Sequence, residues 1–181
     1  KSLADDIVIG IGVNNSASYS NGSVIGGNST DRALMSFLAE CKKADNLSEQ
    51  KVCSFSAFDS VKKSSSAVVE KGGRNVTYVK GAPENIIDLC TRYIDVNGEE
   101  KPFSDKKLLM EYSNAQANRS MRLLAVAKTE NEAANSDFTL VCLISIRDNV
   151  REEAAVAIRE VQNAGIQVVM VTGDRKETAV A

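Results

Sequence analysis

The chain has 181 residues, and its 22 Lys and Arg against 24 Asp and Glu give a formal net charge of -2. This near balance argues against a broad basic face for nucleic acid, and the absence of histidine with four widely spaced cysteines removes the usual zinc-site patterns. The length suffices for one well-cored domain or for one domain with an appendage, and we expect the second.

The cysteines and the hydropathy pattern indicate a reduced, cytosolic chain. There is no Cys-x-x-Cys pair, and no apolar stretch approaches the roughly 20 residues needed to cross a bilayer. The N-terminus, with Asp5 and Asp6, lacks the apolar region of a secretory signal. We therefore expect a soluble chain.

The N-terminal segment contains an apolar run, a polar stretch and a predicted helix. Residues 4–13 are too short and too continuously apolar to distinguish a buried helix from a strand. Residues 14–29 are rich in Asn, Ser and Gly and predict a loop. Ser29 or Thr30 can then cap a helix over about residues 31–43.

The middle of the chain predicts a β-meander followed by a helix and two long strands. Residues 71–75 form a hairpin turn rich in residues that tolerate positive φ. Predicted strands are 52–58, 66–70, 76–80, 121–128 and 138–146, a second hairpin lies around Asn97–Gly98, and helices follow Pro83–Glu84 and run over about 104–119.

The C-terminal part has a different pattern of predicted elements, a helix followed by one strand. A predicted helix runs from Val150 to about Asn163, Gly165 ends it, and residues 166–171 form a wholly apolar strand. This is one αβ step of a parallel sheet, so we place a domain boundary near Asp148.

Two short motifs occur in a fixed order. Residues 80–84 read Lys-Gly-Ala-Pro-Glu, which places an ammonium beside a glycine where backbone can approach a flat ligand. The run 166–171 is closed by Thr-Gly-Asp, a polar turn where open α/β sheets place phosphate chemistry. With Ile-Arg-Asp-Asn-Val-Arg at 146–151, nearly the whole chain resembles P-type cation-transporting ATPases of the calcium-pump-like branch. The matching parts are the nucleotide-binding (N) domain and the beginning of the phosphorylation (P) domain.

The resemblance implies an α/β (α+β) fold, with an antiparallel β-sheet flanked by helices. A short αβ tail would come from an incomplete haloacid-dehalogenase-like P domain. Residues 1–147 would be the N domain and residues 148–181 the P-domain fragment. The resemblance also favours a helix for residues 4–13.

The resemblance further implies a pocket for the adenine base of ATP. Phe58 matches the aromatic residue that stacks on adenine, with a core phenylalanine as the alternative. Lys80 would sit at the back of the pocket near the purine, and Gly81 and Ala82 would keep its wall thin. An exposed strand-end lysine is the alternative for Lys80.

Cations for the phosphates and an apolar wall are implied in the same way. Lys63 and Arg122 match the family's phosphate-side cations, and Leu124 matches a wall position. A strand-edge charge is the alternative for Arg122. Ser60 stands where many relatives carry an arginine, which removes one expected phosphate contact.

Asp31 lies in a segment that resembles the family's Gly-x-x-Thr-Glu-x-Ala-Leu. It takes the place of the glutamate that accepts from the adenine amine, although it is one methylene shorter. A carboxylate is also favoured at a helix N-terminus by the helix dipole, so binding and capping are equally good interpretations.

The C-terminal motif implies a catalytic role within a longer protein. Thr172, Gly173 and Asp174 match the residues that position the transferred phosphoryl group, and Asp148 and Arg151 are candidate hinge contacts to nucleotide, with both usual prolines replaced. The chain contains no Asp-Lys-Thr-Gly-Thr, so we expect the nucleophilic aspartate and the magnesium site of the full pump to lie elsewhere. This chain alone is not expected to catalyse.

The resemblance defines the expected partners. These are ATP, as Mg-ATP in the full-length pump, and the remaining P domain, the actuator domain and the transmembrane helices of the same integral membrane protein. The orphan strand 166–171 is expected to pack on the main domain or to pair with a second copy in a dimer.

Two other functions remain as alternatives. One is a non-catalytic interaction or regulatory domain with degenerate nucleotide binding, which Ser60 slightly favours. The other is a small haloacid-dehalogenase-like phosphatase, which fails because the chain has no Asp-x-Asp nucleophile.

Overall fold

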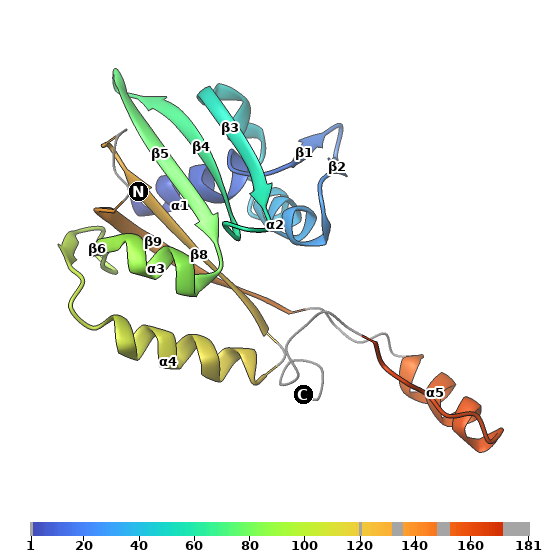
Figure 1. Ribbon diagram of the computed structural model, residues 1–181. Coiled ribbons are helices and arrows are strands. Elements are labelled where there is room, and N and C mark those ends of the chain that lie inside the picture. The colour runs from blue at the N-terminus through green and yellow to red at the C-terminus, as the bar shows by residue number, and fades with distance from the viewer. Residues whose placement is uncertain (1, 120, 132–135, 148–152, 172–181) are drawn as a thin grey trace.

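The computed structural model describes residues 2–119, 121–131, 136–147 and 153–171, and it contains a seven-stranded sheet in the order β3-β4-β5-β8-β9-β6-β7 (Figure 1). All neighbouring strands are antiparallel except β6 and β9, which are parallel. The strands are β3 Lys51–Asp59, β4 Ser64–Lys71, β5 Arg74–Gly81, β6 Cys90–Ile94, β7 Glu100–Pro102, β8 Met121–Thr129 and β9 Phe138–Arg147.

Helices cover the two faces of this sheet (Figure 1). Strand β8 contributes side chains to the cores on both faces, because successive side chains of a strand point to opposite sides. Val126 packs into one core cluster, whereas Ala125 and Ala127 pack into another. The first face carries α1 Ser2–Gly12 and α2 Ser29–Glu40, and the second carries α3 Pro83–Leu89 and α4 Lys106–Ala117. The predicted fold class, a largely antiparallel sheet flanked by helices, is confirmed.

Helix α1 is held to the sheet by a buried carboxylate. Asp6 accepts hydrogen bonds from Tyr78 Oη at 2.7 Å, Lys128 Nζ at 2.7 Å and Lys71 Nζ at 2.8 Å. Burial by itself would raise the pKa of Asp6, but these three donors outweigh burial and hold the pKa below its ordinary value. The helical interpretation of residues 4–13 is confirmed by α1, which ends at Gly12, and the bonds of Asp6 hold this helix to β4, β5 and β8.

The polar stretch 14–29 is more ordered than predicted. It contains a small hairpin, β1 Ala17–Ser20 and β2 Ser23–Gly26, and a short 3₁₀ helix, η1 Asp45–Glu49, follows α2. Asn21 and Gly22, with φ of 51° and 76°, make the hairpin turn. Such an Asn-Gly pair is a strong hairpin signal, which the loop prediction passed over.

The tail strand predicted over 166–171 is wrong. Helix α5 Ala154–Asn163 ends before Gly165, whose φ is 77°, but residues 166–171 form no strand and range in exposure from 43% at Val168 to 94% at Val171. A parallel strand needs neighbours to pair with, and no described strand pairs with this segment.

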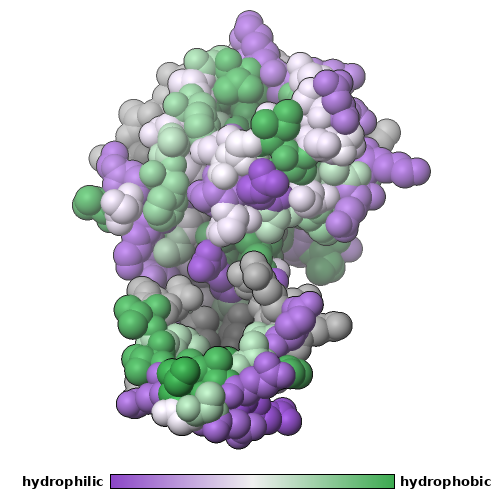
Figure 2. All heavy atoms as spheres, turned by 90° about the vertical axis from the view of Figure 1, so that its right-hand side faces the viewer, coloured by the Kyte–Doolittle hydropathy of each residue, from purple (hydrophilic) through white to green (hydrophobic). Residues whose placement is uncertain are grey.

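Helix α5 also leaves apolar side chains in solvent. Val156, Ile158 and Val161 are exposed, and Figure 2 shows apolar surface gathered at the bottom of the view, where α5 and the residues after it lie. The expected packing of the tail on the main domain is therefore not found among the described residues, and pairing through a tail strand has no strand to support it.

Candidate functional site

A cavity of about 700 Å³ opens where four segments of the main domain meet. These segments are the first turn of α2, the connection from β3 to β4, the end of β5 and the beginning of β8. Its lining consists of Asn28, Ser29, Thr30, Asp31, Phe58, Ser60, Lys63, Ser65, Lys80, Gly81, Ala82, Glu84, Arg122, Leu123 and Leu124. All eight described residues predicted to bind nucleotide are in this set.

Phe58 provides an exposed aromatic face in the cavity wall. It lies near the end of β3, which among the described strands pairs with β4 alone and forms an edge of the sheet, and 54% of the residue is accessible. The alternative that Phe58 is a core phenylalanine is therefore wrong. A half-exposed aromatic ring in a cavity wall can stack on a planar base.

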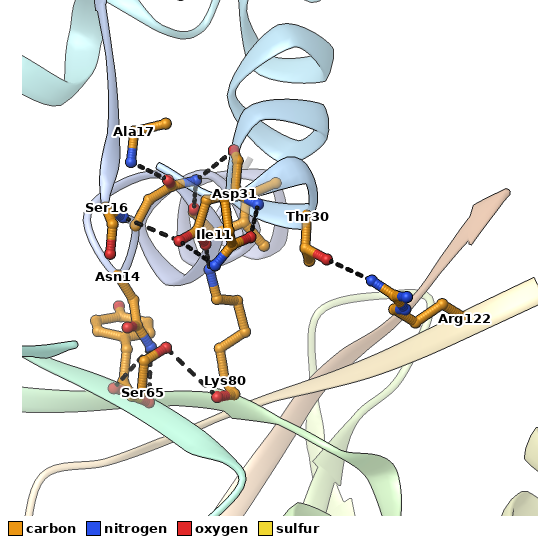
Figure 3. A network of polar contacts seen from close by, with 12 residues as sticks. Ile11, Asn14, Ser16, Ala17, Thr30, Asp31, Ser65, Lys80 and Arg122 are labelled. Atoms are coloured by element: carbon orange, nitrogen blue, oxygen red, sulfur yellow. Dashed lines mark hydrogen bonds and ion pairs between the residues drawn. The ribbon is translucent and has the colours of Figure 1, made fainter. Parts of the chain in front are cut away.

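Lys80 and Asp31 form a buried ion pair at the cavity (Figure 3). Lys80 Nζ lies 2.9 Å from Asp31 Oδ1, and the two side chains are 6% and 8% exposed. The alternative that Lys80 is an exposed strand-end lysine is therefore wrong. Burial lowers the pKa of Lys80, and the hydrogen bond and charge of Asp31 oppose that effect only in part.

Asp31 is held from three directions. Besides Lys80, its Oδ2 accepts from Asn28 Nδ2 at 3.2 Å and from the Ser16 backbone N–H at 3.4 Å (Figure 3). The helix cap is a different residue: Asn28 Oδ1 accepts from the Asp31 backbone N–H at 2.9 Å. The prediction that Ser29 or Thr30 caps α2 is therefore wrong, and the carboxylate of Asp31 faces Lys80 instead of capping the helix.

Gly81 is required by the close approach of two strands. A Cβ at Gly81 would lie 2.9 Å from Ser64 Cα and would collide with the Lys63 carbonyl oxygen. That same oxygen accepts from the Ala82 backbone N–H at 3.1 Å, and Lys63 has a φ of 50°. The thin wall at Gly81 and Ala82 is thus first a consequence of how β5 packs against the start of β4.

Arg122 joins the beginning of β8 to the first turn of α2. Its Nη1 donates to Thr30 Oγ1 at 3.1 Å (Figure 3). This bond brings a guanidinium to the rim that also holds Thr30 and Glu84. Planar guanidinium groups suit phosphate oxygens.

Some predicted residues cannot be placed, and some lining residues were not predicted. Asp148, Arg151, Thr172, Gly173 and Asp174 lie outside the described residues. Asn28 was missed as a site residue although Asn is a strong N-cap signal immediately before a helix, whereas Ser65 and Leu123 carry no such signal. Within the described ranges, no three Cys, Asp or Glu residues group to hold a metal, and no helix could span a membrane.

The chain is similar to known proteins over most of its length. A family model described as "P-type ATPase, cytoplasmic domain N" matches residues 4–153. The chain is 34% identical to plasma membrane calcium-transporting ATPase 4 of Bos taurus over 172 residues, which cover 84% of this chain and 14% of that protein. It is 32% identical to putative calcium-transporting ATPase 11, plasma membrane-type, of Arabidopsis thaliana, over 86% of this chain and 16% of that protein.

Both relatives are far longer than this chain, which spans 14–16% of their length. The family match itself covers most of the chain, including every described residue of the cavity. The chain therefore belongs to the P-type ATPase cytoplasmic domain N family.

Proposed function

We propose that this chain is the nucleotide-binding part of a calcium-transporting P-type ATPase and that the cavity takes ATP by its adenine base. The observation that carries the proposal is that residues far apart in the sequence meet in one cavity. The eight described residues predicted to bind nucleotide, spread from Asp31 to Leu124 along the chain, all line it. The transported ion rests on the names of the relatives, which are calcium-transporting ATPases.

Each part of the cavity has a role in this proposal. Phe58 stacks on the base and Leu124 completes the apolar wall, while Gly81 and Ala82 leave room for the flat ring. Lys80, with Asp31 as its counter-ion, contacts the purine from the buried end. Lys63 and Arg122 lie on the phosphate side. Because the described residues offer an aromatic face and a few cations but no group of acidic residues that could hold a magnesium ion, we expect weak binding, on the order of millimolar.

The proposed division of the chain is residues 1–147 as the N domain and residues 148–181 as a P-domain fragment. In the whole pump, the N domain would present the γ-phosphate of Mg-ATP to an aspartate outside this chain. Thr172, Gly173 and Asp174 would help position the phosphoryl group, and Asp148 and Arg151 would contact nucleotide at the hinge. The rest of the P domain, the actuator domain and the membrane helices would be partners within the same protein, with this part in the cytosol.

A titration of the isotope-labelled chain with ATP, ADP and AMP, followed by NMR, tests the proposal. We expect saturable shifts at Phe58, Lys80, Gly81 and Arg122, similar in affinity for ATP and AMP because the base anchors the ligand. Absence of shifts at these residues at several millimolar ligand would contradict nucleotide binding. That result would favour a regulatory domain with a degenerate site, for which Ser60 in the cavity wall is the first explanation.

A further inference from the structure

The donors and acceptors at the buried end of the cavity determine which atoms of a purine base can be hydrogen-bonded there. The exocyclic amine of adenine is a donor and needs an acceptor, whereas the ring nitrogens are acceptors and need a donor. Asp31 and Lys80 are the buried charged residues of the cavity lining. Of these two, Asp31 can accept from the amine and Lys80 can donate to the ring.

The acceptor capacity of Asp31 is largely occupied. Its two oxygens receive three donors, from Lys80, Asn28 and the Ser16 backbone, and its side chain is 8% exposed. Oδ2 receives two of these donors and Oδ1 receives Lys80, so a ligand amine would have to share Oδ1 with the Lys80 ammonium 2.9 Å away, and turning that oxygen from Lys80 would leave a buried ammonium without its counter-ion. The shorter aspartate side chain gives little freedom to satisfy both.

The donor capacity of Lys80 is not exhausted. An ammonium has three N–H donors, and within the described part of the chain Asp31 is the side chain that Lys80 Nζ binds. Its position in the cavity lining lets the remaining donors point at a ligand. Adenine and unsubstituted purine share acceptors at all their unsubstituted ring nitrogens, with or without the amine.

We propose that Asp31 orients Lys80 and forms no hydrogen bond with the 6-amino group of the base. The cavity then recognises purines by their ring acceptors and tolerates loss of the amine. This inference rests on the proposed function above and narrows it. It assigns the site to purine nucleotides whose ring nitrogens are acceptors, with or without the 6-amino group. Asp31 is a positioning residue in this arrangement.

The test compares two monophosphates on the intact chain by NMR titration: AMP and purine riboside 5′-monophosphate, which lacks the amine but keeps the ring acceptors. We expect dissociation constants within about threefold of one another. If the Asp31 carboxylate accepted from the amine, AMP would bind at least about tenfold more tightly, because that hydrogen bond joins a charged group. A preference of that size overturns the inference and leaves the proposed function intact, whereas failure of both monophosphates and of ATP to bind overturns both.

Variants add an independent reading. Asp31→Asn and Lys80→Met should each weaken AMP and purine riboside monophosphate by the same factor, while Lys62→Met, a neighbouring lysine outside the cavity lining, should change neither. Loss of AMP affinity alone in Asp31→Asn would overturn the inference. Because Asp31→Asn leaves a buried ammonium unpaired, its spectrum is first checked for the native fold, and the comparison of ligands on the unaltered chain stands without it.

Discussion

Arg122 Nη1 donates to Thr30 Oγ1 at 3.1 Å, so that two residues 92 positions apart in the sequence meet at the rim of one cavity. The bond holds a guanidinium next to the first turn of α2, whose N-terminal end favours negative charge. Under the proposed function, a phosphate at this end of the cavity would contact Arg122.

Replacing Arg122 separates phosphate affinity from base affinity. We expect Arg122→Ala to weaken ATP by about fivefold to tenfold, as for a charge-assisted hydrogen bond, and to weaken AMP less. Arg122→Lys should fall between, because a point charge replaces a fork of donors. Isothermal titration of both ligands measures this, with Arg119→Ala, an exposed arginine outside the cavity lining, as the control. An equal loss for AMP and ATP would contradict a contact between Arg122 and the β- or γ-phosphate.

Phe58 can be compared with a second phenylalanine on the same strand. We expect Phe58→Ala to weaken ATP and AMP together by about tenfold, since stacking of a base on an aromatic ring contributes about 1–3 kcal/mol. Phe55 is 43% exposed on β3 and does not line the cavity, so Phe55→Ala should bind nucleotide as the unaltered chain does. Equal effects of the two variants in a titration would show that the strand, and not the Phe58 ring, matters.

Asp6 makes the fold sensitive to acid. Its pKa is lowered in the folded chain, so its contribution to stability is present above the unfolded pKa, near 3.8, and is lost as the pH falls through the folded value. We expect Asp6→Asn to lower the free energy of unfolding by about 3 kcal/mol at pH 7, as when a buried ion pair is broken, and by less below pH 4. Urea unfolding at pH 7 and at pH 3 measures both. A loss that does not shrink in acid would show that the charge of Asp6 is not what stabilises α1.

The four cysteines should divide into two reactivity classes. Cys41 and Cys53 are exposed, whereas burial raises the pKa of the Cys90 thiol to about 12 and that of Cys142 to about 12. Since the thiolate is the reactive form, we expect two thiols to react with a disulfide reagent within minutes at pH 8 and all four after unfolding. Fast reaction of more than two thiols in the native chain would contradict the described packing around Cys90 and Cys142.

The strands of the meander could be predicted because local signals agree with the global fold. The Gly72–Gly73 pair, with φ of 62° and 78°, marks the β4–β5 turn, and alternating apolar residues set the register on either side. The β1–β2 hairpin was missed because both strands are four residues long and lie in a stretch rich in Asn, Ser and Gly, so that its Asn-Gly turn was the main signal. The strand predicted over 166–171 shows the opposite error, since an apolar run specifies a strand only where a neighbour exists.

The members of the site could be predicted from motifs, but their contacts could not. Nothing local to Lys80 or Asp31 says that they form a buried pair across 49 positions, because that pairing depends on how α2 packs on the sheet. The exposure of Phe58 likewise follows from β3 lying at the edge. The sequence predicted Gly81 as a residue that lets the ligand approach the backbone. The structure shows a second reason for glycine here, because a Cβ would collide with the backbone of Lys63 and Ser64.

The position of β3 at the edge of the sheet has a consequence for hydrogen exchange. A strand with one neighbour has fewer protected amides than a central one, so β3 should open locally more often than β5 or β8. If Phe58 stacks on the base, ligand binding selects the closed state of β3, and slower deuterium uptake in residues 51–59 would accompany occupancy. Fraying of this strand would then be coupled to release of the ligand, and mutations that stiffen it would lengthen the residence time of the nucleotide.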